Sequence, residues 1–361
     1  MSGGASRGEG AGAAGRPERA ERAQPAVRAA RLAAGKLPPD LLEGLVLRHR
    51  GARRPELLRG GATGEDAAVL DLGGDLVVAS TDPITAAEAD AGWLAVHVSA
   101  NDVAAAGAEP VAVLLTLLLP EGSEPALVER LMEGAEQAAE EVGLAVAGGH
   151  TEVTPGLPRP ILCSTVLGRR PRGRDVHAGG LRPGDALLLA GSAGMEGAAI
   201  LAADRAEEVR AALGEAAWQR LVELRRRISI VPAARLALEA GSRALHDVTE
   251  GGVWGAAYEM AAASGVGLEL EAEAVPVLPE VRRLCDHFGL DVYRLISSGS
   301  LLVGVGEAAA GPLLERLAAA GIEAARIGRA VGREAGLRLR GPAGWSELEP
   351  PRGDELWRVL G

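Results

Sequence analysis

The sequence predicts a two-domain α/β protein in which helices cover β-sheets. Its 361 residues are 47% hydrophobic, which is enough chain for two cores of ordinary size. Apolar runs of strand length alternate with longer helical patterns along most of the chain, and this alternation favours a layered α/β architecture. Aromatic residues make up only 2% of the chain. We therefore expect cores of closely packed leucine, valine and alanine.

The first segment precedes the predicted domains. Residues 1–35 mix Gly, Ala, Arg and Glu without a core-forming pattern, so we expect a disordered or partly helical tail. Residues 36–50 are predicted to form a short amphipathic helix that starts after a Pro-Pro pair. We place a first domain at residues 36–170 and a second domain at residues 177–345.

The next element is a predicted β-hairpin, because two apolar runs flank a Gly-Gly pair at 73–74. With the turn centred on that pair, residue i faces residue 147 minus i. Asp66 then lies opposite Thr81, and Glu65 lies opposite Asp82. Directly opposed residues are about 5 Å apart at Cβ. The hairpin is therefore expected to gather three carboxylates at its open end.

The rest of the first domain alternates helices and strands. One helix of small apolar residues carries Asn101-Asp102 in its middle. A carboxylate on a helix face meant for the core is costly unless something pairs with it. A later strand runs into the loop Gly148-Gly149-His150-Thr151. The predicted elements are helices at 96–108 and 124–142 and strands at 111–119, 143–147 and 160–167.

The second domain follows a segment at 169–184 that is rich in Pro, Gly and Arg and is predicted to be the linker. Strands and helices alternate again after it. His246-Asp247 is expected just before the first turn of an Ala-rich helix. The other predicted elements are strands at 185–190 and 301–305, helices within 211–227 and at 233–240, and a Ser-rich turn at 297–300.

Composition excludes several classes of function. The net charge is −11 at pH 7 and aromatics are scarce, which disfavours a nucleic-acid-binding protein. Cys163 and Cys285 lie far apart and outside any CxxC pair, so the sequence supports neither a disulfide framework nor a cysteine zinc site. No apolar run approaches the roughly 20 residues that cross a bilayer. We expect a cytoplasmic protein that binds neither nucleic acid nor membrane.

Three carboxylates from separate segments, Asp66, Asp82 and Asp102, are predicted to converge. Such groups repel one another unless a hard cation such as Mg²⁺ lies between them. Asn101 could add a neutral oxygen or hold a phosphate. The alternative, equally open from spacing alone, is that these acids only cap turns and helices.

Two further segments allow both a functional and a structural interpretation. The paired glycines before His150 let backbone N–H groups approach a phosphate, although a tight turn is the simpler explanation. The helix N-terminus expected after Asp247 would welcome anionic oxygens, and His246 could move protons near neutral pH. Asp247 as a plain N-cap is the alternative.

Seven segments, taken in order, resemble one family: GEDAAVLDL, STDP, NDVAAAGAEP, GGHTEVTPG, RPGD, HDVTEGG and SSGSLL. They are similar to the aminoimidazole ribonucleotide (AIR) synthase superfamily, which includes the hydrogenase-maturation protein HypE, thiamine-monophosphate kinase and selenophosphate synthetase. The likeness covers residues 36–339 and is closest to the HypE-like group. It implies two α/β domains, with the N-terminal sheet carrying helices on one face and forming a homodimer interface. It also implies ATP and Mg²⁺ in the groove between the domains.

The resemblance further implies roles for individual residues. The implied metal ligands are Asp66, Asp82, Asp102 and Asp247. The implied nucleotide contacts are Lys36, Glu65, Thr81, Asn101, Gly148, Gly149, His150 and Thr151. His246 is the candidate acid/base. With these roles, a Mg²⁺–ATP complex is the partner that Asp102 requires.

Three hypotheses follow. The first is an ATP- and Mg²⁺-dependent enzyme of the HypE-like group that transfers phosphate to an oxygen of a small substrate or hydrolyses ATP. The second is a nucleotide-binding maturation or regulatory partner without turnover, with a thiamine-monophosphate-kinase-like enzyme as a further alternative. HypE-like proteins end in a cysteine that receives a carbamoyl group, whereas this sequence ends in Leu360-Gly361. The third is a structural dimer whose acids are solvated.

Overall fold

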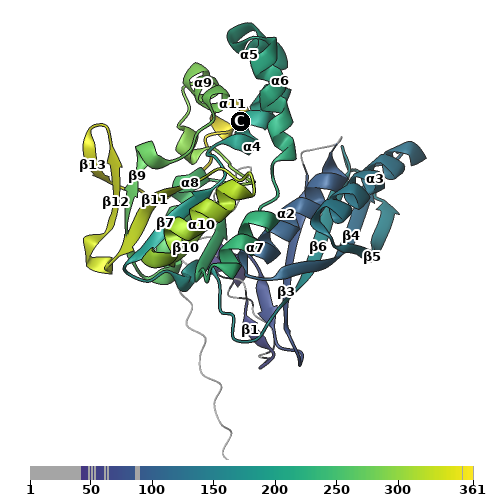
Figure 1. Ribbon diagram of the computed structural model, residues 1–361. Coiled ribbons are helices and arrows are strands. Elements are labelled where there is room, and N and C mark those ends of the chain that lie inside the picture. The colour runs from purple at the N-terminus through teal and green to yellow at the C-terminus, as the bar shows by residue number, and fades with distance from the viewer. Residues whose placement is uncertain are drawn as a thin grey trace, which may run out of the picture.

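Two β-sheets lie side by side in the computed structural model, and helices cover them (Figure 1). The structure describes residues 42–47, 49, 52, 54–60, 62, 65–85, 90–351 and 353–360. The predicted α/β class with two sheet-based parts is confirmed. Within 36–50 the described chain contains a π-helix at Leu42–Leu47. The predicted tail at 1–35 lies outside the described residues.

The first sheet has six strands in the order β1-β2-β3-β6-β4-β5. Its hairpin has the predicted register, because Ala68 faces Ala79 and Leu70 faces Val77. The ladder stops at Ala68, so the chain before it leaves the hairpin and the expected facing pairs of the acids do not form. The strands are β1 (Leu57–Arg59), β2 (Ala68–Leu70), β3 (Leu76–Ile84), β4 (Glu109–Leu119), β5 (Ala145–Val153) and β6 (Ile161–Arg170).

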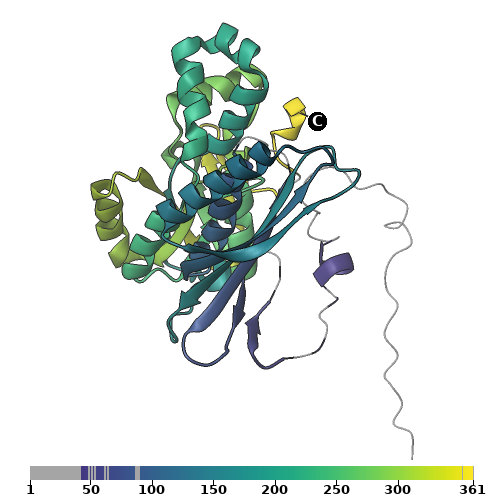
Figure 2. The ribbon, with the colours of Figure 1, turned by 90° about the vertical axis from the view of Figure 1, so that its right-hand side faces the viewer.

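Helices α2 (Ala91–Ala105) and α3 (Pro125–Val142) lie on one side of this sheet (Figure 2). Twelve of the 15 residues of α2 are buried, and the other three, Leu94, Val98 and Asp102, share one half-buried stripe because they are four positions apart. Neighbouring elements therefore cover most of the helix surface. Its small residues permit close backbone contact: a Cβ added to Gly92 would overlap the carbonyl oxygen of Leu131 in α3.

The opposite face of the first sheet is open in the described chain. Burial alternates along β6, with one set of side chains turned to α2 and the other set outward. Large apolar side chains of β4 and β6 on this face are 36–45% exposed: Val111, Leu114 and Leu167. The edge strand β5 is exposed along its whole length. Within the described residues, the first sheet therefore presents an apolar face without a cover.

The predicted loop at 148–151 is wrong, because these residues belong to β5. The strand pairs in parallel with β4, and Leu115 lies opposite Gly149. A Cβ on Gly149 would overlap the backbone of Leu115. Gly149 therefore permits close strand pairing, whereas the sequence pattern suggested a turn.

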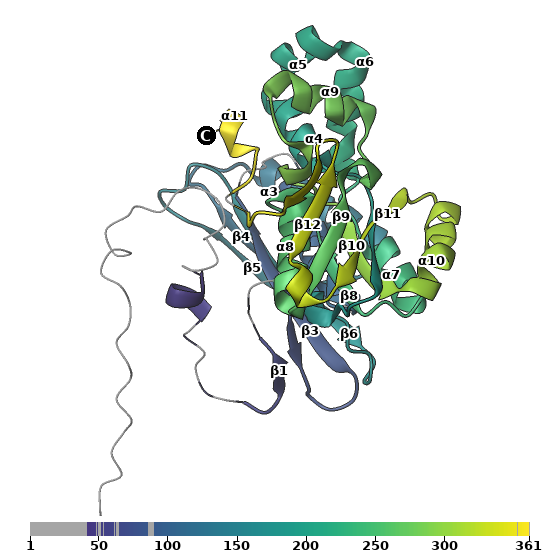
Figure 3. The same ribbon diagram turned by 90° about the vertical axis from the view of Figure 1, so that its left-hand side faces the viewer.

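The second sheet has seven strands in the order β13-β12-β9-β11-β7-β10-β8 (Figure 3). One face packs on α4, α8 and α9, and the other face packs on α7, α10 and the end of α2. The strands are β7 (Asp185–Ala190), β8 (Ala244–Asp247), β9 (Gly267–Glu271), β10 (Leu301–Gly306), β11 (Ala324–Val331), β12 (Leu337–Gly341) and β13 (Gly344–Glu347). The helices are α4 (Met195–Asp204), α5 (Ala206–Leu213), α6 (Glu215–Glu223), α7 (Val231–Glu239), α8 (Gly252–Ser264), α9 (Pro279–Phe288), α10 (Glu307–Ala319) and α11 (Trp357–Leu360).

Most strands and helices predicted for the second part are present with ends shifted by a few residues, and β7 has the predicted bounds. Two details differ. The helical stretch expected within 211–227 is interrupted at Gly214, whose φ of 89° no right-handed helix adopts. His246 and Asp247 end strand β8, and residues 248–251 separate them from α8.

The two parts share a core. Ala104 and Ala105 of α2 pack in one cluster with Leu188 of β7, Leu245 of β8 and Val303 of β10. Helix α2 is therefore enclosed between the first sheet and the second part of the chain (Figure 1). This enclosure places Asp102 at the seam between the two parts.

Two smaller observations complete the description. Among the described residues, none of the helices combines the length and apolarity that membrane crossing requires. Cys163 and Cys285 are both free thiols. Burial raises the pKa of Cys285 to about 12, so this thiol stays protonated and unreactive at neutral pH.

We predict that Gly92→Ala destabilises the protein, because the added methyl group forces α2 and α3 apart. Overpacking of this kind costs about 1–3 kcal/mol. The matched control is Gly311→Ala in α10, where an added Cβ meets nothing within 4 Å. The control should be neutral or stabilising by about 0.4–1 kcal/mol. Urea unfolding measures both effects, and equal stability of the two variants would contradict the close α2–α3 packing.

Candidate functional site

Four carboxylates meet at the seam between the two parts of the chain. Asp102 lies in α2, Asp82 lies in β3, Asp66 lies just before β2, and Asp247 is the last residue of β8. The negative charges of the other three act on Asp102 and raise its pKa. The three acids expected to converge do so in the structure, and Asp247 joins them from the second part.

The site carries excess negative charge. Burial, followed by the charges of Asp247 and Asp82, raises the pKa of Asp102 well above its usual range. The hydroxyl of Ser80 donates a hydrogen bond of 2.5 Å to Asp102 Oδ2. Asp82 Oδ2 is buried and has no hydrogen-bond partner in the described chain. A buried carboxylate oxygen without a donor is costly, and a bound cation would remove that cost.

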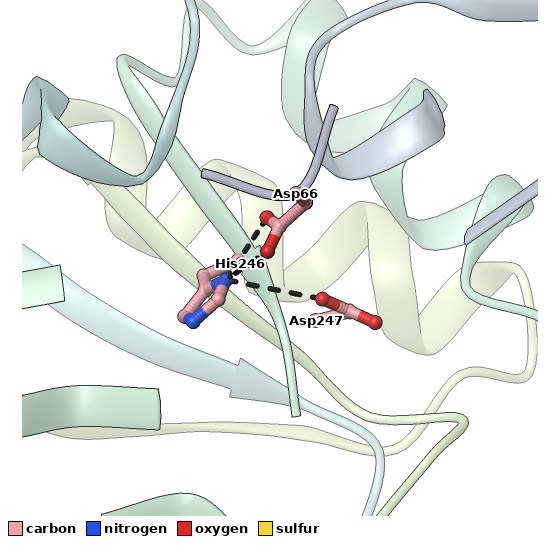
Figure 4. A group of neighbouring side chains, drawn as sticks. All are labelled: Asp66, His246 and Asp247. Atoms are coloured by element: carbon pink, nitrogen blue, oxygen red, sulfur yellow. Dashed lines mark hydrogen bonds and ion pairs between the residues drawn. The ribbon is translucent and has the colours of Figure 1, made fainter. Parts of the chain in front are cut away.

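His246 lies beside Asp66 and Asp247 (Figure 4), and a further carboxylate, that of Glu259, lies at its other ring nitrogen. Its Nδ1 is 2.9 Å from the Asp66 carboxylate and 3.8 Å from Asp247 Oδ1. Its Nε2 is 2.9 Å from Glu259 Oε2. Burial by itself lowers the pKa of His246, but the negative charges and hydrogen bonds of Asp66 and Glu259 outweigh burial and raise it well above its usual value.

Strand β8 explains how one dipeptide reaches both sides of the second sheet. Ala244 belongs to the cluster that contains α8, and Leu245 belongs to the cluster that contains the end of α2. Side chains alternate along a strand. His246 therefore faces the α8 side, where Glu259 lies, and Asp247 faces the α2 side, where Asp102 lies.

The sequence pattern did not identify Glu259 or Ser80 as site residues. Glu259 is the one charged residue in α8, a helix otherwise made of small, apolar and aromatic residues with a terminal serine. The same anomaly drew attention to Asp102 in α2, so it could have identified Glu259. Ser80 gave no signal, since a serine in a hairpin strand is ordinary.

Asn101 has a structural role that the sequence did not reveal. The side chain is 2% exposed. Its Nδ2 donates to the carbonyl of Ile228 at 2.6 Å, and its Oδ1 accepts from the N–H of Ile230 at 3.0 Å. These bonds tie α2 to the segment before α7. The backbone therefore engages both polar atoms of Asn101, and the phosphate contact implied by the family resemblance stays a prediction.

Glu65 and Thr81 also have other partners. Glu65 Oε1 lies 3.6 Å from Arg59 Nε and 3.5 Å from His177 Nδ1. The hydroxyl of Thr81 donates to the carbonyl of Ser164 at 2.9 Å. The expected position of Glu65 opposite Asp82 is wrong, because the hairpin ladder ends before it.

The remaining implied nucleotide contacts stay predictions. Gly148, Gly149, His150 and Thr151 lie on the exposed edge strand β5. The imidazole Nε2 of His150 is 3.0 Å from Glu152 Oε2 on the same strand. Lys36 lies outside the described residues.

Comparison with known proteins gives the same family for both parts of the chain. Residues 64–170 match the N-terminal domain of AIR synthase related protein, and residues 182–339 match its C-terminal domain. The chain is 34% identical over 341 residues to carbamoyl dehydratase HypE of Rhodobacter capsulatus, covering 90% of this chain and 95% of that protein.

Solved structures show the same architecture. The hydrogenase maturation protein HypE in complex with ATP is 28% identical, with a TM-score of 0.67 over 88% of this chain and 95% of that chain. A structure titled AaThiL complexed with AMPPCP and TMP superposes with a TM-score of 0.71 at 22% identity, over 90% of this chain and 99% of that chain. The similarity to this second structure shows a shared fold alone.

We predict that Asp102→Asn stabilises the metal-free protein near neutral pH. The raised pKa means that the folded chain holds the Asp102 proton more tightly than the unfolded chain does. Stability is therefore lost as pH rises from the usual aspartate pKa, about 3.9, to the raised value. Asparagine does not ionise, so the variant does not lose this stability as the pH rises. We expect a higher Tm at neutral pH, where about 2–4 °C corresponds to 1 kcal/mol.

The difference in Tm between wild type and Asp102→Asn should shrink as the pH falls toward about 4. At that pH the folded and the unfolded wild type both hold the Asp102 proton. Exposed Asp75 provides the control substitution, Asp75→Asn, which should leave the melting temperature unchanged. Thermal melting in the presence of a chelator measures all three proteins. An Asp102→Asn variant that melts below wild type at neutral pH would contradict the assigned charge excess.

Proposed function

This chain belongs to the AIR synthase-related protein family, and from that premise we propose that it is an ATP-using enzyme of the HypE-like group. It binds ATP with Mg²⁺ at the seam between its two parts and directs the terminal phosphate onto an oxygen of a small substrate. The observation that carries the proposal is the meeting of Asp66, Asp82, Asp102 and Asp247.

The residues at the seam fit Mg²⁺. Carboxylate oxygens are the ligands that Mg²⁺ prefers, and it is commonly held by one or two carboxylates together with substrate phosphates. Asp82 contributes a buried oxygen without a partner, and Asp102 contributes a carboxyl whose pKa the neighbouring acids raise. When bound, Mg²⁺ neutralises negative charge on the phosphates of ATP.

The chain's own residues supply positioning. Asp102 is fixed by the enclosure of α2, and Asp247 is fixed by the pairing of β8 with β10. Pre-organised ligands of this kind lower the barrier to phosphoryl transfer, because little reorganisation is needed during the reaction. Both ring nitrogens of His246 already contact carboxylates. The geometry therefore favours a role for His246 in holding the site together over the acid/base role.

A relative supports the nucleotide part of the proposal. The HypE protein crystallised with ATP shares this fold at 28% identity. The carbamoyl dehydratase activity named for the Rhodobacter capsulatus relative makes a small carbamoyl-bearing group one candidate acceptor. A nucleotide-binding partner without turnover is distinguished by the absence of ADP formation.

We also propose a homodimer that acts in the cytoplasm. The open face of the first sheet carries Val111, Leu114 and Leu167 as exposed apolar side chains. Contiguous apolar surface of this kind commonly marks an interface. A second copy of the same face is a self-complementary cover.

We expect calorimetric titration to show ATP binding that requires Mg²⁺. Asp102→Asn should reduce the Mg²⁺-dependent affinity by roughly 10-fold or more, because it removes one charged ligand. Asp75→Asn, a substitution of the same chemistry on the surface, should bind like wild type. The rate of ADP formation without any added acceptor gives the basal turnover of both variants.

Two outcomes would contradict this proposal. Binding of ATP with equal affinity in Mg²⁺ and in a chelator would exclude the metal role of the carboxylates. An intact protein that binds no ATP at all would exclude the ATP-using enzyme.

We predict that Leu114→Glu converts the dimer to a monomer, because it places a charge in the centre of the apolar face. Sedimentation velocity reports the change in mass. The control is Trp345→Glu on β13, whose side chain is 45% exposed on the other sheet. A wild-type protein that sediments as a monomer at micromolar concentration would contradict the proposed interface.

A further inference from the structure

We propose that His246 is a metal ligand, and that it completes with Asp66 and Asp247 a mixed nitrogen–oxygen site for a divalent first-row transition ion such as Mn²⁺ or Co²⁺. Glu259 positions the imidazole for this role. The inference rests on the proposed function, because the same seam holds the metal. It goes further by assigning a nitrogen ligand to the metal and by giving the site a preference for transition ions over Mg²⁺.

The ligand atoms are already gathered. One donor atom from each of Asp66, His246 and Asp247 can be chosen so that all lie within 4.8 Å of one another. The Nδ1 of His246 is 2.9 Å from Asp66 and 3.8 Å from Asp247 Oδ1 (Figure 4). Ligands bonded at about 2.0–2.2 Å to one ion lie roughly 3–4 Å apart. Small side-chain adjustments are enough to surround an ion.

Glu259 gives His246 the support that metal-binding histidines typically have. Such a histidine almost always donates its other ring N–H to a carboxylate or carbonyl, which fixes the tautomer and the ring orientation. Here Nε2 lies 2.9 Å from Glu259 Oε2. Nε2–H donates to Glu259, and a cation that displaces the Nδ1 proton paired with Asp66 would find the Nδ1 lone pair turned toward Asp66 and Asp247. The imidazole is 4% exposed, so water does not compete for it.

An independent observation shows that the seam lacks positive charge. In the described chain Asp82 Oδ2 is buried without a hydrogen-bond partner, whereas the ring nitrogens of His246 contact Asp66, Asp247 and Glu259. An ion pair between His246 and Asp66 therefore leaves the cluster incompletely neutralised. A divalent ion adds charge that can be shared with the remaining carboxylates.

The nitrogen ligand sets the preferred metal. Imidazole suits transition ions, and affinity for sites with such ligands rises from Mn²⁺ through Co²⁺ toward Cu²⁺. Mg²⁺ prefers oxygen ligands and near-ideal octahedral geometry. A site of two carboxylates and one imidazole should therefore bind Co²⁺ and Mn²⁺ more tightly than Mg²⁺.

The first experiment is pulsed EPR on the metal-free full chain loaded with one equivalent of Mn²⁺. We expect nitrogen coupling from a directly bound imidazole in the wild type. This coupling should be lost in His246→Gln and retained in His287→Gln, a partly exposed histidine in α9 that pairs with Glu208. Bound Mn²⁺ without nitrogen coupling in the wild type would overturn the proposal.

The second experiment is Co²⁺ titration followed by visible absorption. His246→Gln should raise the Kd for Co²⁺ by at least about 10-fold, while the Kd for Mg²⁺ changes much less. Glu259→Gln should weaken Co²⁺ binding by about 10-fold as well, the lower end of the usual effect of such a supporting carboxylate. Equal Co²⁺ affinity in wild type and His246→Gln would also overturn the assignment.

The two proposals fail in different ways. Mg²⁺-dependent ATP binding in a protein whose Mn²⁺ shows no nitrogen coupling would overturn the histidine ligand alone. Absence of both ATP and Mn²⁺ binding would overturn the proposed function. Circular dichroism shows whether His246→Gln is folded. If this variant is unfolded, two other measurements decide whether His246 binds the metal: the nitrogen coupling of Mn²⁺ in the wild type and the Co²⁺ affinity of Glu259→Gln.

Discussion

The enclosure of helix α2 between the two parts of the chain is the constraint on which the rest of the structure depends. Its small residues allow α3 to approach one side and the second part to approach another. The amide of Asn101 joins it to the backbone before α7 through two hydrogen bonds. Asp102, the next residue, is therefore held in place among the acids of other segments. A more ordinary amphipathic helix would have left one face in water and the carboxylate solvated.

The local structure could be predicted where sequence chemistry is unambiguous. A Gly-Gly pair between apolar runs specifies a hairpin, and its register is as expected. The same dipeptide at 148–149 permits either a turn or close strand pairing, and only the neighbouring β4 decides between them. The convergence of the acids was predictable as a cluster. Its exact membership was not, because the hairpin ladder ends at Ala68, and the chain before it places Glu65 near Arg59 and Asp66 near His246.

Contacts between distant segments explain the remaining differences. Asp66 and His246 are 180 positions apart, and no local pattern links them. The backbone bonds of Asn101 could not be predicted from its place beside Asp102, because neighbours on a helix point in different directions. Glu259 is the instructive case, since one charge in a helix of small, mostly apolar residues is itself a signal. The partner of such a charge, however, becomes visible only in three dimensions.

The charge excess at the seam has a mechanical consequence. Asp82, Asp102 and Asp66 belong to the first part, whereas His246 and Asp247 belong to the second. Repulsion among the carboxylates opposes the approach of the parts, while the shared core of α2, β8 and β10 and the Asn101 bonds hold them together. His246 offsets part of the repulsion through its contact with Asp66. A cation bound at the seam would remove more of the repulsion and so stiffen the junction. Occupancy of the site and the relative rigidity of the two parts are therefore physically coupled.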